Sequence, residues 1–203
     1  MDSLHRLEEL FAKFPGIGPR QAKRFVYYLL NKSPSYLREF TQLVEEVKKS
    51  TSECGQCHRI FFGKDSVGHI CSICADKNRD GSLLMIVARD SDFETIEKSG
   101  AYRGLYFILG GTIPVLDKEP DKRIRLQGLL EHVSTFKSIK EIILSLNATP
   151  EGEHTATIVK EAIGKVTENS SVKISLLGRG LSTGAELEYV DGETIRNALQ
   201  NRH

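Results

Sequence analysis

Four cysteines in two closely spaced pairs are the residues of this sequence with the clearest chemistry. Cys54 and Cys57 form one Cys-x-x-Cys pair, Cys71 and Cys74 form a second, and thirteen residues separate the two pairs. Thiolates at this spacing suit a tetrahedral zinc site. Because four thiolates leave no open coordination position for a water nucleophile, we expect one structural zinc ion per chain.

Disulfide bonds are the alternative use of the same cysteines. No apolar run reaches the roughly 20 residues that span a bilayer, and the N-terminus mixes charged and apolar residues instead of showing a secretory signal. We therefore expect a cytoplasmic protein without membrane contact, whose cysteines the cytosol keeps reduced. With four cysteines available, His58 and His69 are expected to be surface residues and not ligands.

A second group of residues, near the N-terminus, has the composition of a phosphate-binding turn. Residues 14–19, Phe-Pro-Gly-Ile-Gly-Pro, have the form of a helix-hairpin-helix element, in which two glycines permit a tight turn whose amides approach a phosphate. Amides and cationic side chains contact phosphates and not base edges, so DNA binding would be independent of sequence. The expected DNA-binding residues are Gly16, Gly18, Arg20, Lys23 and Arg24.

The charge balance restricts where nucleic acid could bind. The net charge is only +1 over 203 residues, so a binding surface must be a local patch. Residues 13–32 contain five basic residues and no acidic one. An ordinary helical hairpin with solvated charges is the alternative interpretation, and the missing acids favour the DNA-binding one.

Acidic residues form the third group. Asp90 and Asp92 follow the first predicted strand, and Glu151 and Glu153 follow the third, after a turn at residues 147–150. Active sites of open parallel sheets gather at the carboxyl ends of the strands, and oxygen ligands there could hold Mg²⁺. The alternative is that these loop acids are simply solvated.

What is absent from this acidic edge argues against catalysis. The first strand ends in Ala88-Arg89, so no carboxylate lies at its tip, and no Asp-x-Asp follows the third strand. Phosphoryl transfer needs its metals and base positioned together. We therefore expect that the protein is not an enzyme.

The elements that must position these residues follow from apolar periodicity, which predicts helices at 3–13 and 19–31 and a third helix beginning at Ser33-Pro34. Further on, strand-like runs alternate with helical patterns, which indicates a mostly parallel sheet flanked by helices and an α/β fold with several parts. The strands are expected at Leu83–Ala88, Leu105–Leu109, Glu141–Leu146 and Val172–Leu177, and the helices at Phe93–Ser99, Leu126–Phe136, Thr155–Val166 and about Glu193 to Asn201.

Taken in order, these parts resemble the RecR family over almost the whole chain. Residues 14–24 are similar to the family's hairpin motif, and residues 100–111, 149–156 and 184–199 are similar to other family signatures. The resemblance implies a helix-hairpin-helix DNA-binding region at 1–52, a four-cysteine zinc finger at 53–78, a Toprim domain at 79–170, and at 171–203 a C-terminal strand, glycine-rich loop and helix that complete the fold or form an oligomer contact.

The resemblance also implies a function. Members of the family are recombination mediators in recombinational DNA repair, without nuclease or topoisomerase activity. They form an oligomeric clamp on DNA, here expected to be a dimer or a tetrameric ring, and cooperate with RecO and RecF to load recombinase on gapped DNA. A partner-binding acidic edge would consist of Asp90, Asp92, Glu151 and Glu153.

The sequence departs from the family pattern at three places. Ala88 stands where a glutamate is usual, the loop after Ile113-Pro114 is shorter and lacks glycines, and residues 178–184 differ from the usual Gly-x-Pro-x-Gly-Gly run. One rival function is a magnesium-dependent Toprim nuclease or topoisomerase-like enzyme, against which Ala88 counts. A second is a nucleotide-binding module that uses residues 178–184, against which the lack of a lysine-bearing P-loop counts.

Overall fold

The structure is a computed structural model that describes residues 2–63, 69–117, 119, 122–168 and 171–201. Its contacts divide the chain into two compact units, Met1–Thr51 and Ser52–His203. No helix among the described residues is both long enough and apolar enough to cross a membrane.

The first unit consists of three helices, α1 (Ser3–Ala12), α2 (Pro19–Leu30) and α3 (Pro34–Ser50). Local signals explain where they begin. The side chains of Asp2 and Ser33 accept amide hydrogen bonds at the starts of α1 and α3, and Pro19 and Pro34 occupy first-turn positions, where no intrahelical donor is needed. The predicted helices are thus confirmed, with ends that differ by about one residue.

The second unit is built on a four-stranded sheet, β3 (Asp80–Val87), β4 (Gly104–Ile108), β5 (Glu141–Ser145) and β6 (Lys173–Leu176), whose order is β4-β3-β5-β6. All neighbouring strands are parallel. The central strand β3 pairs Ile86 with Phe107 on one side and with Leu144 on the other. The predicted parallel α/β sheet is confirmed.

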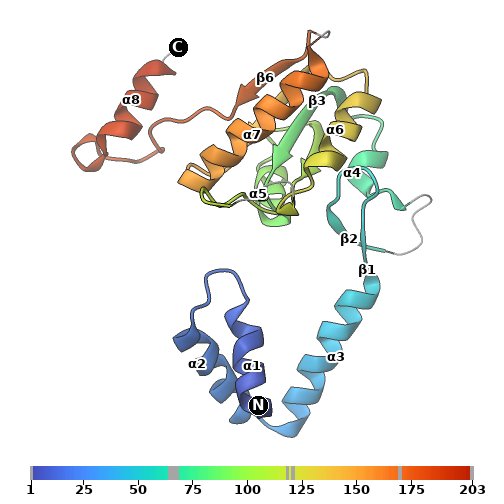
Figure 1. The fold of residues 1–203 in the computed structure, drawn as a ribbon, viewed down its shortest axis with the longest axis vertical. Coiled ribbons are helices and arrows are strands. Elements are labelled where there is room, and N and C mark those ends of the chain that lie inside the picture. The colour runs from blue at the N-terminus through green and yellow to red at the C-terminus, as the bar shows by residue number, and fades with distance from the viewer. Residues whose placement is uncertain (1, 64–68, 118, 120–121, 169–170, 202–203) are drawn as a thin grey trace. The chain divides into compact units, whose positions relative to one another are not determined.

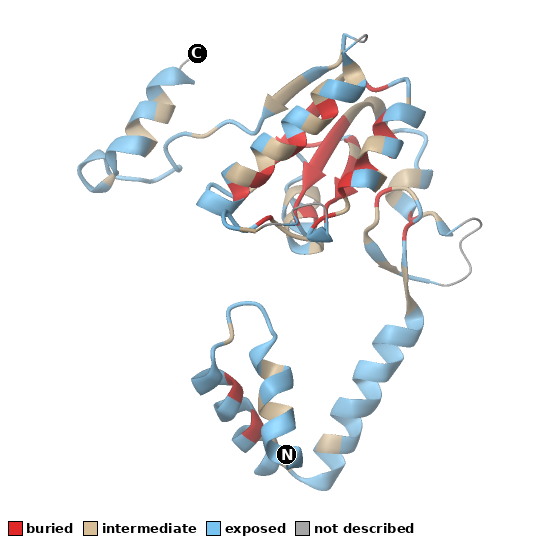
Figure 2. Cartoon of the chain, viewed as in Figure 1, coloured by how far each residue is buried: buried red, intermediate tan, exposed pale blue. Residues whose placement is uncertain are grey.

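Helices cover both faces of this sheet (Figure 1). The helices α6 (Leu126–Thr135) and α7 (Pro150–Thr167) lie on one face, and α5 (Asp90–Ser99) lies on the other. Because successive strand residues point to opposite faces, the core has two parts. One part contains Ile86 of β3 with residues of α6 and α7, and the other contains Val87 with Phe93 of α5. Figure 2 shows the buried residues concentrated on the sheet and on the helix faces against it.

Several short elements complete the second unit. The cysteine segment contains β1 (Thr51–Glu53), which pairs with β2 (Ile60–Phe62), and α4 (Ser72–Ala75), while the C-terminal segment contains η3 (Leu187–Tyr189) and α8 (Gly192–Gln200). All except α8 are too short to show a periodic apolar pattern, so the sequence did not predict them.

Two predicted helix starts were wrong. Helix α5 begins at Asp90, not at residue 93, and α7 begins at Pro150, not at residue 155. Thr149 caps α7, and its side chain accepts the amide of Gly152. The first turns are polar and interrupt the apolar period, which is why the pattern missed them. The four acids expected in loops, Asp90, Asp92, Glu151 and Glu153, therefore lie in the first turns of helices.

Candidate metal centre and nucleic-acid interface

The four cysteines come together in one cluster. Their sulfur atoms lie within 4.8 Å of one another, with 3.9 Å between the Sγ atoms of Cys54 and Cys74 and 3.6 Å between those of Cys57 and Cys71. A tetrahedral ion with Zn–S bonds of about 2.3 Å places its sulfurs about 3.8 Å apart. A disulfide needs about 2.05 Å, and all four cysteines are free. The cluster therefore has the size of a metal site.

Backbone hydrogen bonds hold the cysteines toward a common centre. The amide of Cys71 donates to the Sγ of Cys54, and the amide of Gly55 donates to the carbonyl of His69. Both His58 (φ 62°) and His69 (φ 54°) adopt the left-handed conformation, which turns the chain sharply after the first pair and before the second. Neither histidine belongs to the cluster. His69 is exposed as expected, and His58 is partly exposed, with 28% of its side chain open to solvent.

The cysteine segment is attached to the sheet by several contacts. The amide of Ile108 in β4 donates to the carbonyl of Cys57, and the amide of Ile60 in β2 donates to Asp90 at the start of α5. The guanidinium of Arg59 lies 4.5 Å from the ring centroid of Phe93. A metal ion in the cluster would thus order a segment that connects directly to the strand ends.

A histidine is buried between the cysteine segment and α6. His132 is 8% exposed, and its ring stacks on Phe136 at 4.3 Å and meets the edge of Phe107 at 5.6 Å. The pKa of His132 is lowered to about 4. The main cause is burial, which disfavours the charged imidazole, and the second is the nearby His58. The imidazole is therefore neutral near pH 7 and serves as an aromatic packing residue. The sequence pattern gave no sign of this role.

In the first unit, the hairpin turn has the tight backbone conformation that was predicted from its glycines. Gly16 has φ +75°, a conformation that L side chains rarely adopt, and nothing lies within 4 Å of where a Cβ would be at Gly16 or Gly18. The amide of Ile17 donates to the carbonyl of Phe14, which closes the turn, and Gly18 directly precedes α2. Gly18 has no side chain that could cap α2, so the first-turn amides of Arg20 and Gln21 have no capping partner among the described residues and are available to a phosphate.

The three basic residues lie on one face of α2. Lys23 and Arg24 lie three and four positions after Arg20, and all three residues are exposed. The opposite face carries Ala22 and Val26, which are buried against α1. Within the described part of the chain, no ion pair engages any of these three cations. They are therefore free to meet an external anion.

The four acids of the predicted acidic edge do not converge on one point. Asp90 accepts the amide of Ile60, Asp92 accepts the amide of Arg89 at its own helix start, and Glu153 pairs with Arg179 at 2.6 Å. Across the described residues, the cysteines are the one group of three or more potential ligands close enough to share an ion. No hydrogen bond or ion pair engages the carboxylate of Glu151 within that same set.

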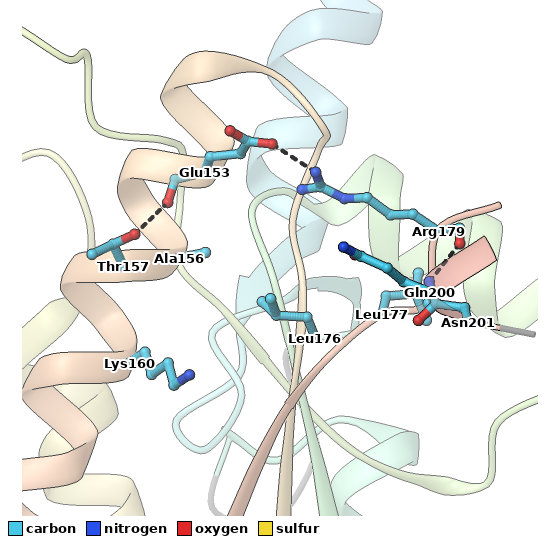
Figure 3. A pocket seen from close by; sticks show the side chains of 10 residues that line it. Glu153, Ala156, Thr157, Lys160, Leu176, Leu177, Arg179, Gln200 and Asn201 are labelled. Carbon is cyan, nitrogen blue, oxygen red and sulfur yellow. Dashed lines mark hydrogen bonds and ion pairs between the residues drawn. The ribbon is translucent and has the colours of Figure 1, made fainter. Parts of the chain in front are cut away.

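The contact of Glu153 with Arg179 closes one side of a hollow between α7, the end of β6 and α8 (Figure 3). Asn201 donates a hydrogen bond to the carbonyl of Arg179, and the guanidinium of Arg179 pairs with Glu153. The loop after β6 is therefore held through both the backbone and the side chain of Arg179. The hollow has a volume of about 430 Å³ and is lined by apolar Leu176 and Leu177 as well as by Lys160. The pairing of residues 26 positions apart carries no sequence signal, which is why it was not predicted.

Comparisons with known proteins agree with this arrangement. A family model described as a Toprim domain matches residues 82–177, and one described as the C-terminal part of RecR matches residues 180–203. The chain is 36% identical to recombination protein RecR of Chloroflexus aurantiacus over 97% of this chain and 92% of that protein. It is 36% identical to the RecR protein of Cereibacter sphaeroides over 98% and 95%, and 31% identical to that of Ligilactobacillus salivarius over 99% and 96%.

Proposed function

This chain belongs to the RecR family of recombination proteins, and on that premise we propose that it is a recombination mediator in DNA repair that holds DNA without cutting it. One observation carries the DNA-binding part of the proposal. The glycine turn of residues 16–18 leads directly into a helix face where Arg20, Lys23 and Arg24 are exposed and unpaired among the described residues. Contacts of this kind bind phosphates irrespective of base sequence.

The metal in this proposal is Zn²⁺, held by Cys54, Cys57, Cys71 and Cys74. Sulfur separations of 3.6 and 3.9 Å support this choice, because a set of four thiolates favours zinc over hard cations such as Mg²⁺. The ion would supply no reaction chemistry, since the cysteines fill its coordination sphere. Its role would be to hold the segment that contacts Asp90 and β4.

We propose that the protein is not an enzyme, because three of the four carboxylates of the acidic edge already have partners within the chain. Two of its carboxylates accept backbone amides and a third is neutralised by Arg179. Ala88, which follows β3, is buried and offers no ligand. A Toprim nuclease or topoisomerase would need these groups to gather around Mg²⁺, so the pure protein with Mg²⁺ should neither cut nor relax plasmid DNA.

The proposed partners are RecO and RecF, and the proposed assembly is a dimer or a tetrameric ring in the cytoplasm. A single hairpin with three cations binds DNA weakly, and several hairpins in one oligomer raise the apparent affinity through effective concentration. The acidic edge of Asp90, Asp92, Glu151 and Glu153 would receive a basic surface of the partner. Glu151→Lys is the cleanest test of that contact, because the other three acids also support the fold.

The experiment that tests DNA binding compares wild type with Arg20→Glu/Arg24→Glu by fluorescence anisotropy across a salt series, with light scattering on the same samples. The matched control is Lys48→Glu/Lys49→Glu, which makes the same change in charge at the last turn of α3. We expect the first variant to keep its oligomeric mass and lose salt-sensitive binding, and the control to bind like wild type. Unchanged binding by the first variant would place the DNA site elsewhere.

A further inference from the structure

Two tyrosines of α2 lie beside its basic residues and are about half exposed, and Tyr28 also interacts with Tyr36 of α3. Tyr27 is 48% exposed and Tyr28 is 51% exposed. Tyr27 lies seven residues after Arg20, four after Lys23 and three after Arg24, so the helix repeat places it on the same face as all three cations. The buried face of α2, at Ala22 and Val26, points the other way.

Cations lie over both aromatic rings. The Nζ of Lys23 is 5.9 Å from the ring centroid of Tyr27, and the Nζ of Lys32 is 4.2 Å from that of Tyr28. Lys32 and, to a lesser extent, Tyr36 of α3 lower the pKa of Tyr28. Such contacts keep each ring close to a positive charge while leaving much of the ring open to solvent.

An amphipathic hollow adjoins the same face. It has a volume of about 490 Å³ and lies next to the glycine turn. Its walls are apolar and aromatic, and an amide and a guanidinium complete its lining. The residues that line it are Ile17, Gln21, Arg24, Phe25 and Tyr28.

We propose that this face of α2 binds single-stranded DNA, with the phosphates on Arg20, Lys23 and Arg24 and unpaired bases stacked on Tyr27 and Tyr28. Interleaved cations and aromatic rings are the arrangement that binds single strands with little sequence preference. The acid-free stretch from Lys13 to Lys32 makes the surface complementary to a polyanion. The inference rests on the proposed DNA-binding function and names the form of DNA that the hairpin prefers.

Base stacking within the duplex explains why the tyrosines would discriminate between the two forms of DNA. Phosphates are available in single-stranded and duplex DNA alike, so the cations contribute to binding both. In a duplex, each base face is covered by its neighbours and cannot reach a tyrosine ring. The preference for unpaired DNA would therefore depend on the aromatic residues and not on the charge.

The test is the affinity of Tyr27→Ala and Tyr27→Phe for oligo(dT) and for a duplex of the same length, measured at one salt concentration with light scattering. Since base stacking on an aromatic ring is worth about 1–3 kcal/mol, Tyr27→Ala should bind oligo(dT) at least about 5-fold more weakly. Its duplex affinity should stay within about 2-fold of wild type. Tyr27→Phe keeps the stacking surface and should bind both like wild type. Tyr189→Ala, which removes an exposed tyrosine of η3, is the control.

Intrinsic fluorescence gives a second readout, because the chain has six tyrosines and no tryptophan. Oligo(dT) should quench part of the tyrosine emission of wild type, and that part should shrink in Tyr27→Phe even though binding is retained. This result would support direct stacking, and equal quenching in both proteins would count against it.

The remaining outcomes separate this inference from the proposed function. If Tyr27→Ala binds both DNAs like wild type while Arg20→Glu/Arg24→Glu binds neither, the stacking role is wrong and the hairpin still binds DNA. If Tyr27→Ala loses oligomeric mass, the face is occupied by a second copy of the chain and the inference is overturned. Failure of wild type to bind any DNA would overturn both.

Discussion

Each thiol of the cysteine cluster should be required for metal binding, because the four sulfurs lie within 4.8 Å of one another and no other described Cys, His, Asp or Glu belongs to the group. We expect Cys71→Ser to bind zinc far more weakly and to destabilise the second unit by several kcal/mol, since the metal contributes to folding. Zinc content after dialysis and amide exchange at Ile60 and Ile108 would measure both effects. Ser72→Ala, at the adjacent position, should change neither. Full zinc content in Cys71→Ser would contradict the four-thiolate site.

His132 should make stability depend on pH. Its pKa is lowered to about 4 in the folded protein, against an ordinary value of about 6.5 when unfolded. The unfolded chain then binds the extra proton between these values, so stability falls as pH decreases from about 6.5 to about 4 and is fully present above that window. The loss amounts to at most about 3 kcal/mol.

The test of this prediction is the difference in unfolding free energy between zinc-loaded wild type and His132→Phe from pH 7.5 to pH 4.5. Phenylalanine keeps an aromatic ring between Phe107 and Phe136 and cannot be protonated. The variant should lose less stability than wild type on acidification. Loss of zinc at low pH affects both proteins, so the difference isolates the histidine. Parallel pH curves would show that His132 does not titrate as inferred.

At the residue scale, what the sequence could predict depended on local spacing. Two Cys-x-x-Cys pairs at this spacing are typical of a four-thiolate zinc site, so the cluster was foreseeable. Tertiary packing brings together Asp90 and Ile60, which are 30 residues apart, and likewise Glu153 and Arg179. For that reason the pattern suggested an open acidic edge, whereas the structure engages three of its carboxylates.

Helix α7 depends on a glycine at its first turn. A Cβ at Gly152 would lie 2.0 Å from the carbonyl oxygen of Asn147, which is backbone and cannot move aside without distorting the chain. Gly152→Ala should therefore destabilise the protein by at least about 2 kcal/mol through steric strain. The shift in urea midpoint at constant slope would measure it.

The same helix contains its own control. Gly164 has nothing within 4 Å of an added Cβ, so Gly164→Ala should stabilise the protein by about 0.5–1 kcal/mol through helix propensity alone. Opposite signs for the two alanines would show that Gly152 is required by a close backbone approach. Stabilisation by both substitutions would contradict the close approach of Gly152 to the backbone of Asn147.

At the element scale, periodicity predicted the long elements and failed at polar starts. The four strands and α6 bury continuous apolar stripes, so their positions were foreseen to within about three residues. The first turns of α5 and α7 are set by Asp92 and Thr149, which make cap hydrogen bonds and carry no periodic signal. The strands of the cysteine segment have three residues each and rely on the cysteine cluster and the sheet for support.

At the scale of the whole molecule, exposed apolar residues on α3 bear on assembly. Leu43, Val44 and Val47 are each about half exposed, at 51%, 57% and 48%. Apolar residues at this helical spacing lead one to expect a buried stripe, and within one chain that expectation is wrong. One chain shows that this face of α3 is exposed. The contacts between copies, which set the number of chains in an oligomer, are not specified by one sequence or one chain.

The number of hairpins that hold DNA at once can be counted from the dependence of affinity on salt. Each phosphate contact contributes about −0.9 to the slope of log affinity against log salt on duplex DNA, so three cations from one hairpin give a slope of about −2.7. A clamp that engages two hairpins should give about −5.4. Lys23→Ala removes one contact per hairpin and should make the slope less negative by about 0.9 for each hairpin engaged.

A change near 1.8 in a protein that scatters as an oligomer would support the clamp. A change near 0.9 would mean that the oligomer uses one hairpin at a time, and encirclement of DNA would then have to be abandoned even if the hairpin itself binds.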